Sequence, residues 1–236
     1  MEEDEDFLSL PSSRADKAAD IALAALADLV QALMPIPVSS TIGAFLARAK
    51  KKRLDDAFET LVKLIESGRL DLRDEPSIEH LIPRAMVYFE AAERGEYHHN
   101  LRTLGMLLAC MSPADFGGNS IRQAARRIEA MTFEQLEFLV LLNCVFAEKE
   151  KEIDHDVYCV IEDHDVVRFE GREYTPPEQR VNSFLADLLS RGLLSVRSGP
   201  ARVGDIIGGL NYRRTDAFFE IIDAAASTVH DLKRSG

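Results

Sequence analysis

Tryptophan is absent from the 236-residue chain, and aromatic residues together make up only 7 % of it. Aromatic and β-branched residues favour strands, whereas alanine and leucine, which dominate here, favour helices. The 46 % apolar and 29 % charged content is that of a folded protein rather than a disordered one. The composition therefore predicts a mainly α fold.

Cysteine is scarce as well. Cys110, Cys144 and Cys159 are far apart and odd in number, which indicates neither a disulfide framework nor a Cys-x-x-Cys metal site. The first residues are acidic where a secretory signal is basic. We therefore expect no export signal and a cytoplasmic location.

Several catalytic signatures are also missing. The chain contains no G-x-S-x-G, no glycine-rich phosphate loop before a helix and no H-E-x-x-H. We find no nucleophile whose spacing from a base would pair the two. The sequence thus predicts a protein that is not an enzyme and that uses no cofactor.

Basic residues are in the minority, with 28 Lys and Arg against 40 Asp and Glu and a formal net charge of −12 at pH 7. Binding along a nucleic acid needs a cationic field, so this balance argues against a general nucleic-acid coat. Part of the acidic excess is local, because residues 2–6 are all acidic. We expect residues 1–12 to form a solvated, disordered tail.

The first half of the chain has helical patterning. Residues 13–34 are rich in alanine and predict one helix, which Pro35 and Pro37 end. A second helix follows, with apolar residues at helical spacing. These residues are Leu54, Phe58, Leu61, Val62 and Ile65. The pattern predicts a helical hairpin over 13–67 and, with further helices, a helical bundle over 13–131.

Residues 132–236 form the second predicted domain. Thr132 and Gln135 make a capping box at the start of an apolar helix. Two β-branched and aromatic runs, 157–161 and 166–169, suggest a hairpin. A capped helix then ends at Gly192, and strands at 193–198 and 210–214 flank a glycine-rich loop. Thr215 caps the last helix.

The phrase LADLLSRGLLSV…LNYRRTDAFFEII resembles the L-x-x-L-x-x-x-G-L-[LI]…Y-x-x-T-x-x-G pattern of MarR- and PadR-like regulators. In that pattern a leucine-rich helix is followed at once by a two-stranded wing, and the threonine opens a closing helix. The resemblance covers residues 176–231 and implies a winged-helix-like fold. Phe218 stands where the pattern has glycine. The whole chain resembles bacterial helical proteins without an assigned role.

Arginines gather in the predicted wing. Residues 176–214 contain six arginines against three acidic residues, and phosphate contacts need such a cluster. The candidate nucleic-acid-binding residues are Arg197, Arg202, Tyr212, Arg213 and Arg214. The alternative is that these arginines are solvated side chains of a strand pair.

The N-terminal hairpin suggests a different function. Residues 21–47 carry one charge, Asp28, and the basic run RAKKKR follows them. A hydrophobic hairpin beside a basic cluster suits an anionic membrane surface, although the prolines leave segments too short to span a bilayer. The hairpin can instead be buried or can associate with a second copy.

Two acidic turns contain histidine. His155, Asp156, His164 and Asp165 could converge on a divalent metal if the runs between and beside them pair as a hairpin. The spacing matches no named zinc motif, and acidic turns are common.

Together these patterns predict a mainly α protein with an N-terminal helical hairpin and bundle, followed by a winged-helix-like unit with a small β-hairpin wing. They favour a bacterial interaction or regulatory protein without catalytic activity, whose partner is a protein, a second copy or DNA. Membrane association through the hairpin is the alternative function.

Overall fold

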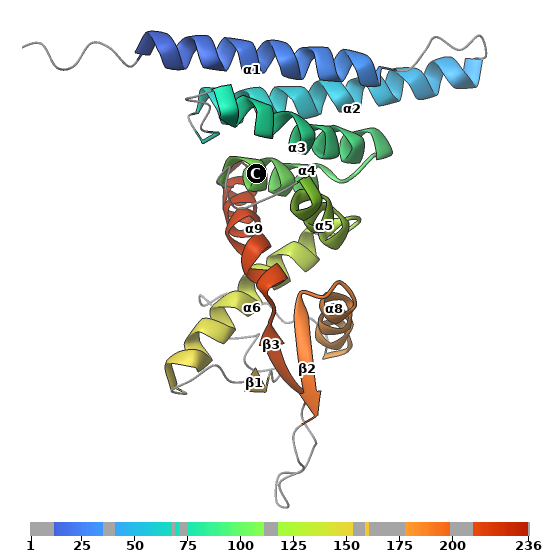
Figure 1. Cartoon of the computed structure of the whole chain (residues 1–236). Coiled ribbons are helices and arrows are strands. Elements are labelled where there is room, and N and C mark those ends of the chain that lie inside the picture. The colour runs from blue at the N-terminus through green and yellow to red at the C-terminus, as the bar shows by residue number, and fades with distance from the viewer. Residues whose placement is uncertain are drawn as a thin grey trace, which may run out of the picture. The chain divides into compact units, whose positions relative to one another are not determined.

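The computed structural model describes residues 12–34, 41–67, 69–70, 75–110, 118–152, 159–160, 178–198 and 210–235. Helices dominate these residues, which confirms the mainly α class (Figure 1). The chain divides into two compact units, Met1–Ala125 and Arg126–Gly236. This division falls within helix α5, Gly118–Ile128, whereas the sequence placed its boundary after residue 131.

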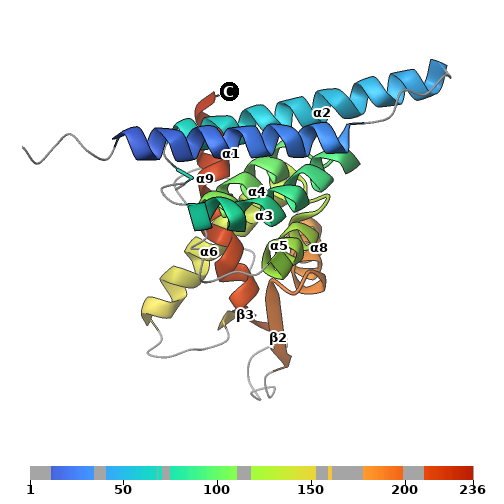
Figure 2. The ribbon, with the colours of Figure 1, turned by 45° about the horizontal axis from the view of Figure 1, so that its top comes forward.

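The first unit is built on two long helices, α1 (Ser12–Leu33) and α2 (Thr41–Glu66). They pack against each other and against α3 (Glu75–Arg94), and α2 also packs against α4 (His98–Cys110). Figures 1 and 2 show α1 and α2 side by side, as the arms of the predicted hairpin. The proline-containing turn that joins them lies outside the described residues.

The core of the first unit is mostly apolar, and the buried polar side chains of its described residues are Arg84, Asn100 and Thr103. Its fully buried large side chains are Leu26, Leu54, Leu61, Tyr88, Phe89, Leu104 and Ile121. A Cβ added at Gly105 would lie 3.0 Å from Leu64 Cδ1, so α4 approaches α2 closely at a residue without a side chain. The buried Tyr88 hydroxyl donates to the Ala57 carbonyl at 3.1 Å, and burial raises its pKa.

The buried face of α2 differs from the predicted one. Leu54, Leu61 and Ile65 are buried as expected, but Phe58 and Val62 are only half-buried. Ala57 and Leu64 complete the buried face instead. The inward stripe is therefore rotated by part of a turn, towards the side on which α4 packs.

In the described residues of the second unit, three helices join a small sheet. These helices are α6 (Phe133–Glu152), α8 (Glu178–Ser190) and α9 (Asp216–Ser235), and α6 packs against α9. The predicted capping box of α6 is confirmed: the Gln135 backbone N–H donates to Thr132 Oγ1 at 3.2 Å, and the Thr132 N–H donates to Gln135 Oε1 at 2.7 Å.

The sheet has the strand order β1–β3–β2 and is antiparallel throughout. Strands β2 (Leu194–Ser198) and β3 (Leu210–Arg214) form the predicted hairpin, paired from Leu194↔Arg214 to Ser198↔Leu210. Strand β1 (Cys159–Val160) pairs with β3. The second run of the hairpin predicted around β1, 166–169, lies outside the described residues.

A tight turn leads from α8 directly into β2. Gly192 has a φ of +69°, which favours glycine, and ends the helix as predicted. Its N–H donates to the Leu189 carbonyl at 3.0 Å, and the Leu193 N–H donates to the Leu188 carbonyl at 2.9 Å. These two bonds form a Schellman motif, with Leu193 and Leu188 both buried.

Thr215 connects the other end of the hairpin to the same turn. As predicted, its hydroxyl caps α9 by accepting from the Phe218 N–H at 3.3 Å. The same hydroxyl lies 2.8 Å from the Gly192 carbonyl oxygen and 3.0 Å from that of Leu193. One side chain therefore fixes the start of α9 against the end of α8.

Candidate nucleic-acid interface

Helix α8 has one buried and one exposed face. Its buried residues are Val181, Phe184, Leu185 and Leu188, and Leu189, which the sequence also placed inside, is half-buried. Its exposed residues from 181 onward are Asn182, Ser183, Ala186 and Ser190. All four are small or polar, and none is charged.

This face is polar, as the solvated face of a helix usually is, but none of these four side chains carries a charge. Small side chains let a helix approach a partner closely. In a major groove, Asn can bond adenine, Ser can bond several bases, and Ala can contact a thymine methyl. A helical projection of residues 181–190 shows from the sequence that this face has no charge. The sequence prediction considered only the inward residues of the helix and did not identify this face.

The β2–β3 hairpin has an inner and an outer face. Leu194 and Tyr212 are buried, whereas Ser195 and its partner in register, Arg213, are half-buried and exposed respectively. Tyr212 is only 7 % exposed, and burial raises its pKa. Of these predicted interface residues, Arg213 has an exposed side chain and Tyr212 belongs to the core.

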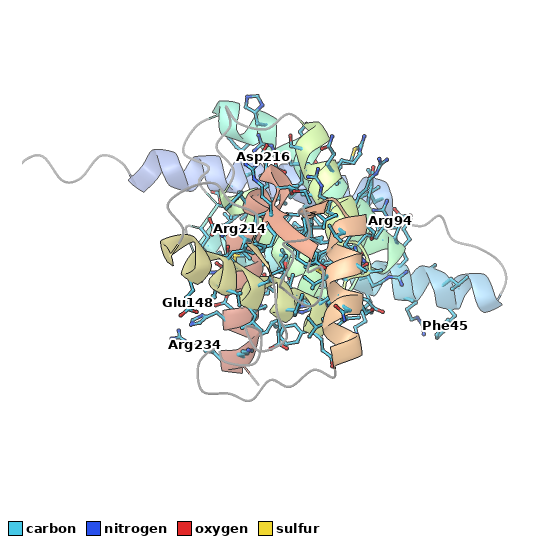
Figure 3. The ribbon with its side chains drawn as sticks, turned by 90° about the horizontal axis from the view of Figure 1, so that it is seen from below. Phe45, Arg94, Glu148, Arg214, Asp216 and Arg234 are labelled. Atoms are coloured by element: carbon cyan, nitrogen blue, oxygen red, sulfur yellow. The ribbon has the colours of Figure 1, made fainter. Side chains whose placement is uncertain are left out.

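Arg214, adjacent on β3, is engaged within the unit (Figure 3). Its guanidinium carbon lies 4.6 Å from the ring centroid of Phe219 and 5.4 Å from that of Phe146. Its Nη1 donates to Asn143 Oδ1 at 2.6 Å. Arg214 therefore joins β3 to α6 and α9 by cation–π contacts and a hydrogen bond, which is a structural role.

Arg191 has a comparable structural role that the sequence did not indicate. Its Nε lies 2.7 Å from Asp187 Oδ2, and its Nη1 donates to the carbonyls of Arg127 and Glu129, each at 2.8 Å. The carbonyls at and just beyond the end of α5 are thereby satisfied by a half-buried cation.

The arginine cluster is thus smaller than the count suggests. Arg213 is exposed on β3. Arg197 lies in β2 opposite Asn211 in the register, but its side chain and the whole of Arg202 lie outside the described residues. An interface here would combine the neutral face of α8 with arginines of the hairpin.

The predicted metal ligands His155, Asp156, His164 and Asp165 all lie outside the described residues. Within the described part of the chain, no group of three or more His, Cys, Asp or Glu side chains is placed to hold a metal ion.

In the same part of the chain, no single helix is long and apolar enough to cross a bilayer. Two consecutive helical segments, Ser120–Ile128 and Phe133–Glu148, have the required length and apolar content only when they are taken together, and they are bent by 111° relative to each other. Comparison with protein-family models, with curated proteins and with solved structures gives no match for this chain. The function must therefore be inferred from the geometry of the chain itself.

Proposed function

We propose that the second unit is a winged-helix-like module through which the protein acts as a regulatory or interaction protein rather than as an enzyme. The observation that carries the proposal is the arrangement around α8: this helix turns at Gly192 directly into the β2–β3 hairpin, and β1 pairs with the far side of β3. In a winged helix, likewise, the reading helix precedes a two-stranded wing, and a strand from earlier in the chain completes the sheet.

Duplex DNA is the partner that we propose for this module. The exposed face of α8 offers uncharged groups suited to base edges, with Asn182 as the strongest candidate for a specific contact. The adjoining hairpin supplies Arg213, Arg197 and Arg202 for phosphates. A supporting helix before α8 would fall in residues 161–177, which lie outside the described residues.

The net charge of the chain determines how strong and how salt-dependent we expect DNA binding to be. A net charge of −12 repels DNA at long range, so the attraction depends on a few local arginines. We therefore expect weak non-specific binding, specificity that depends on α8, and a salt dependence that corresponds to a small number of phosphates.

Fluorescence anisotropy with a random-sequence duplex pool, followed by sequencing of the bound fraction, tests the proposal. Replacing Arg197, Arg202 and Arg213 by alanine should weaken binding to all duplexes. The slope of log K against log salt concentration should become shallower by about one unit for each phosphate that is no longer neutralised. Arg234→Ala, at the exposed end of α9, is the control for the loss of a positive charge.

The Asn182→Ala variant tests the role of α8 separately. Because Asn182 is exposed, the fold should be unaffected, whereas discrimination between the enriched sequence and a one-base variant should fall by about 1–3 kcal/mol. Absence of binding and of any enriched sequence at low salt would exclude duplex DNA and leave a protein as the partner of this module.

A further inference from the structure

The start of α2 exposes two large apolar side chains. Phe45 is 72 % exposed and Leu46 is 60 % exposed. Figures 1 and 2 show the first turns of α2 extending beyond the ends of α1 and α3, and Figure 3 shows Phe45 projecting from this part of the helix. Two exposed hydrophobic residues in succession cost solvation free energy unless something covers them.

Basic residues border Phe45 on one side. Arg48 and Lys52, both exposed, follow Phe45 by three and seven residues, which places them on the same side of the helix as Phe45. The half-buried Ala49 lies on the other side of Phe45, between it and Leu46 around the helix. Phe45, Leu46, Arg48 and Lys52 together form what we call the α2 tip.

The neighbouring basic residues anchor α2 to the first unit. Lys50 Nζ lies 2.5 Å from Glu93 Oε1 of α3. The Arg53 guanidinium lies against Gly95 at the end of α3, where an added Cβ would be 2.8 Å from its Nη1. The helix is therefore held to α3 just beyond the α2 tip.

We propose that the α2 tip docks on the surface of an anionic lipid bilayer, with Phe45 and Leu46 in the headgroup–acyl boundary and the two cations among the lipid phosphates. A helix that lies in this interface needs an apolar face bordered by Lys or Arg, whose aliphatic stems extend to the charged headgroups. The proposal is independent of the one for α8, because it rests on different residues of the other unit.

Charge complementarity favours a bilayer over a second copy of the chain as the occupant. In a two-fold symmetric dimer whose axis passes through the tip, the cations of one tip would meet those of the other, because the exposed Asp55 and Asp56 lie beyond the tip. Anionic headgroups neutralise them instead. The rest of the chain is strongly acidic, so attraction to an anionic surface is confined to such a patch.

Cosedimentation of the full-length protein with vesicles tests the proposal. One set of vesicles is phosphatidylcholine, and the other is an equal mixture of phosphatidylcholine and phosphatidylglycerol. We expect binding to the mixed vesicles, weakened by high salt, and little binding to phosphatidylcholine. Phe45→Ser with Leu46→Ser should reduce the affinity by at least about tenfold.

A second pair of variants separates charge from hydrophobicity. Arg48→Gln with Lys52→Gln should reduce the affinity about fivefold for each residue. Lys51→Gln with Lys63→Gln changes the net charge equally. Lys51 lies about 120° around the helix from Phe45, and Lys63 lies eighteen residues, or about 27 Å, along it, so these substitutions should leave binding unchanged. Ile21→Ser, at a residue 59 % exposed on α1, is the control for loss of an exposed apolar side chain.

Light scattering and circular dichroism on the same proteins complete the experiment. Unchanged circular dichroism of the variants with loss of vesicle binding supports the proposal. Failure of the unaltered protein to bind the mixed vesicles overturns it, as does equal loss of binding in the Lys51/Lys63 variant. A dimer that Phe45→Ser with Leu46→Ser converts to a monomer, without vesicle binding, would identify a second copy as the occupant and also overturn it.

Discussion

Two ion pairs of the same length, one in each unit, have very different surroundings. Lys63–Glu59 in α2 and Arg191–Asp187 at the end of α8 each join residues four apart at 2.7 Å. The side chains of the first pair are 69 % and 65 % exposed, and those of the second only 17 % and 27 %. Lys63 lowers the pKa of Glu59, but an exposed pair is screened by water and contributes little to stability.

The difference extends to the units themselves. In the first unit the inward faces of the helices are mostly apolar, and α4 can approach α2 closely because Gly105 has no side chain. Directional contacts between its helices, Tyr88 to the Ala57 carbonyl and Lys50 to Glu93, lie beside this apolar core. In the second unit Arg191, Arg214 and Thr215 form hydrogen bonds between elements that are distant in sequence, and these bonds fix a helix and a hairpin in one orientation.

Leu61→Ala should have the largest effect, in the first unit. Leu61 is fully buried near Gly105, so its truncation leaves a cavity and should lower the free energy of unfolding by about 2–5 kcal/mol. Urea unfolding measures this value. Leu46→Ala, at an exposed leucine of the same helix, should change it little, and an equal loss in both variants would contradict the assignment of the core.

Arg191→Ala tests the directional bonds of the second unit. The substitution removes an ion pair and two charge-assisted bonds to carbonyls, so we expect a loss of about 2–3 kcal/mol in unfolding free energy. Lys63→Ala, in the exposed pair of equal length, should give no measurable change in urea unfolding. If the two losses are alike, the contrast between the pairs fails.

Arg214→Lys sharpens the comparison within a single strand. Lysine keeps the charge but loses the planar group that contacts Phe146 and Phe219, so unfolding free energy should fall by about 1–2 kcal/mol. Arg213→Lys, at the adjacent residue, keeps the charge of a side chain that is exposed and should cost less than Arg214→Lys. Thermal unfolding followed by circular dichroism measures both, and a larger loss at Arg213 would reverse the roles assigned to the two arginines.

Ala130→Gly should have the smallest effect, and it should be stabilising. Ala130 follows α5 with a φ of +56°, a left-handed conformation that strains residues with a side chain. Glycine adopts it without strain, so we expect a gain of about 0.5–1 kcal/mol in urea unfolding. A loss of stability would mean that the Ala130 methyl group contributes more by packing than its backbone conformation costs.

Local signals were enough to predict much of the fold. The capping box at Thr132, the helix end at Gly192 and the cap at Thr215 follow from rules that involve only a few neighbouring residues. The strands predicted at 193–198 and 210–214 were found at Leu194–Ser198 and Leu210–Arg214. These features need no knowledge of distant contacts.

The candidate site was less predictable, because its contacts join distant parts of the chain. Arg214 meets Phe146 and Asn143, and Arg191 meets carbonyls more than sixty residues away. A charge count treats both as solvated cations. The pairing of β1 with β3, which joins Cys159 to Tyr212, is equally remote in sequence, and strand patterning alone does not identify a partner.

The closure of the hairpin base has a practical consequence for engineering. The Leu194↔Arg214 pair, the Thr215 N–H bond to the Leu193 carbonyl and the Thr215 hydroxyl hold the two strand ends together. Since these ends are fixed independently of the residues that connect β2 to β3, lengthening that connection adds only a slowly growing closure entropy. An affinity tag or fluorescent reporter inserted between Ser198 and Leu210 should therefore leave the β2–β3 pairing intact, and its effect on DNA binding would report on the proposed contact of Arg202.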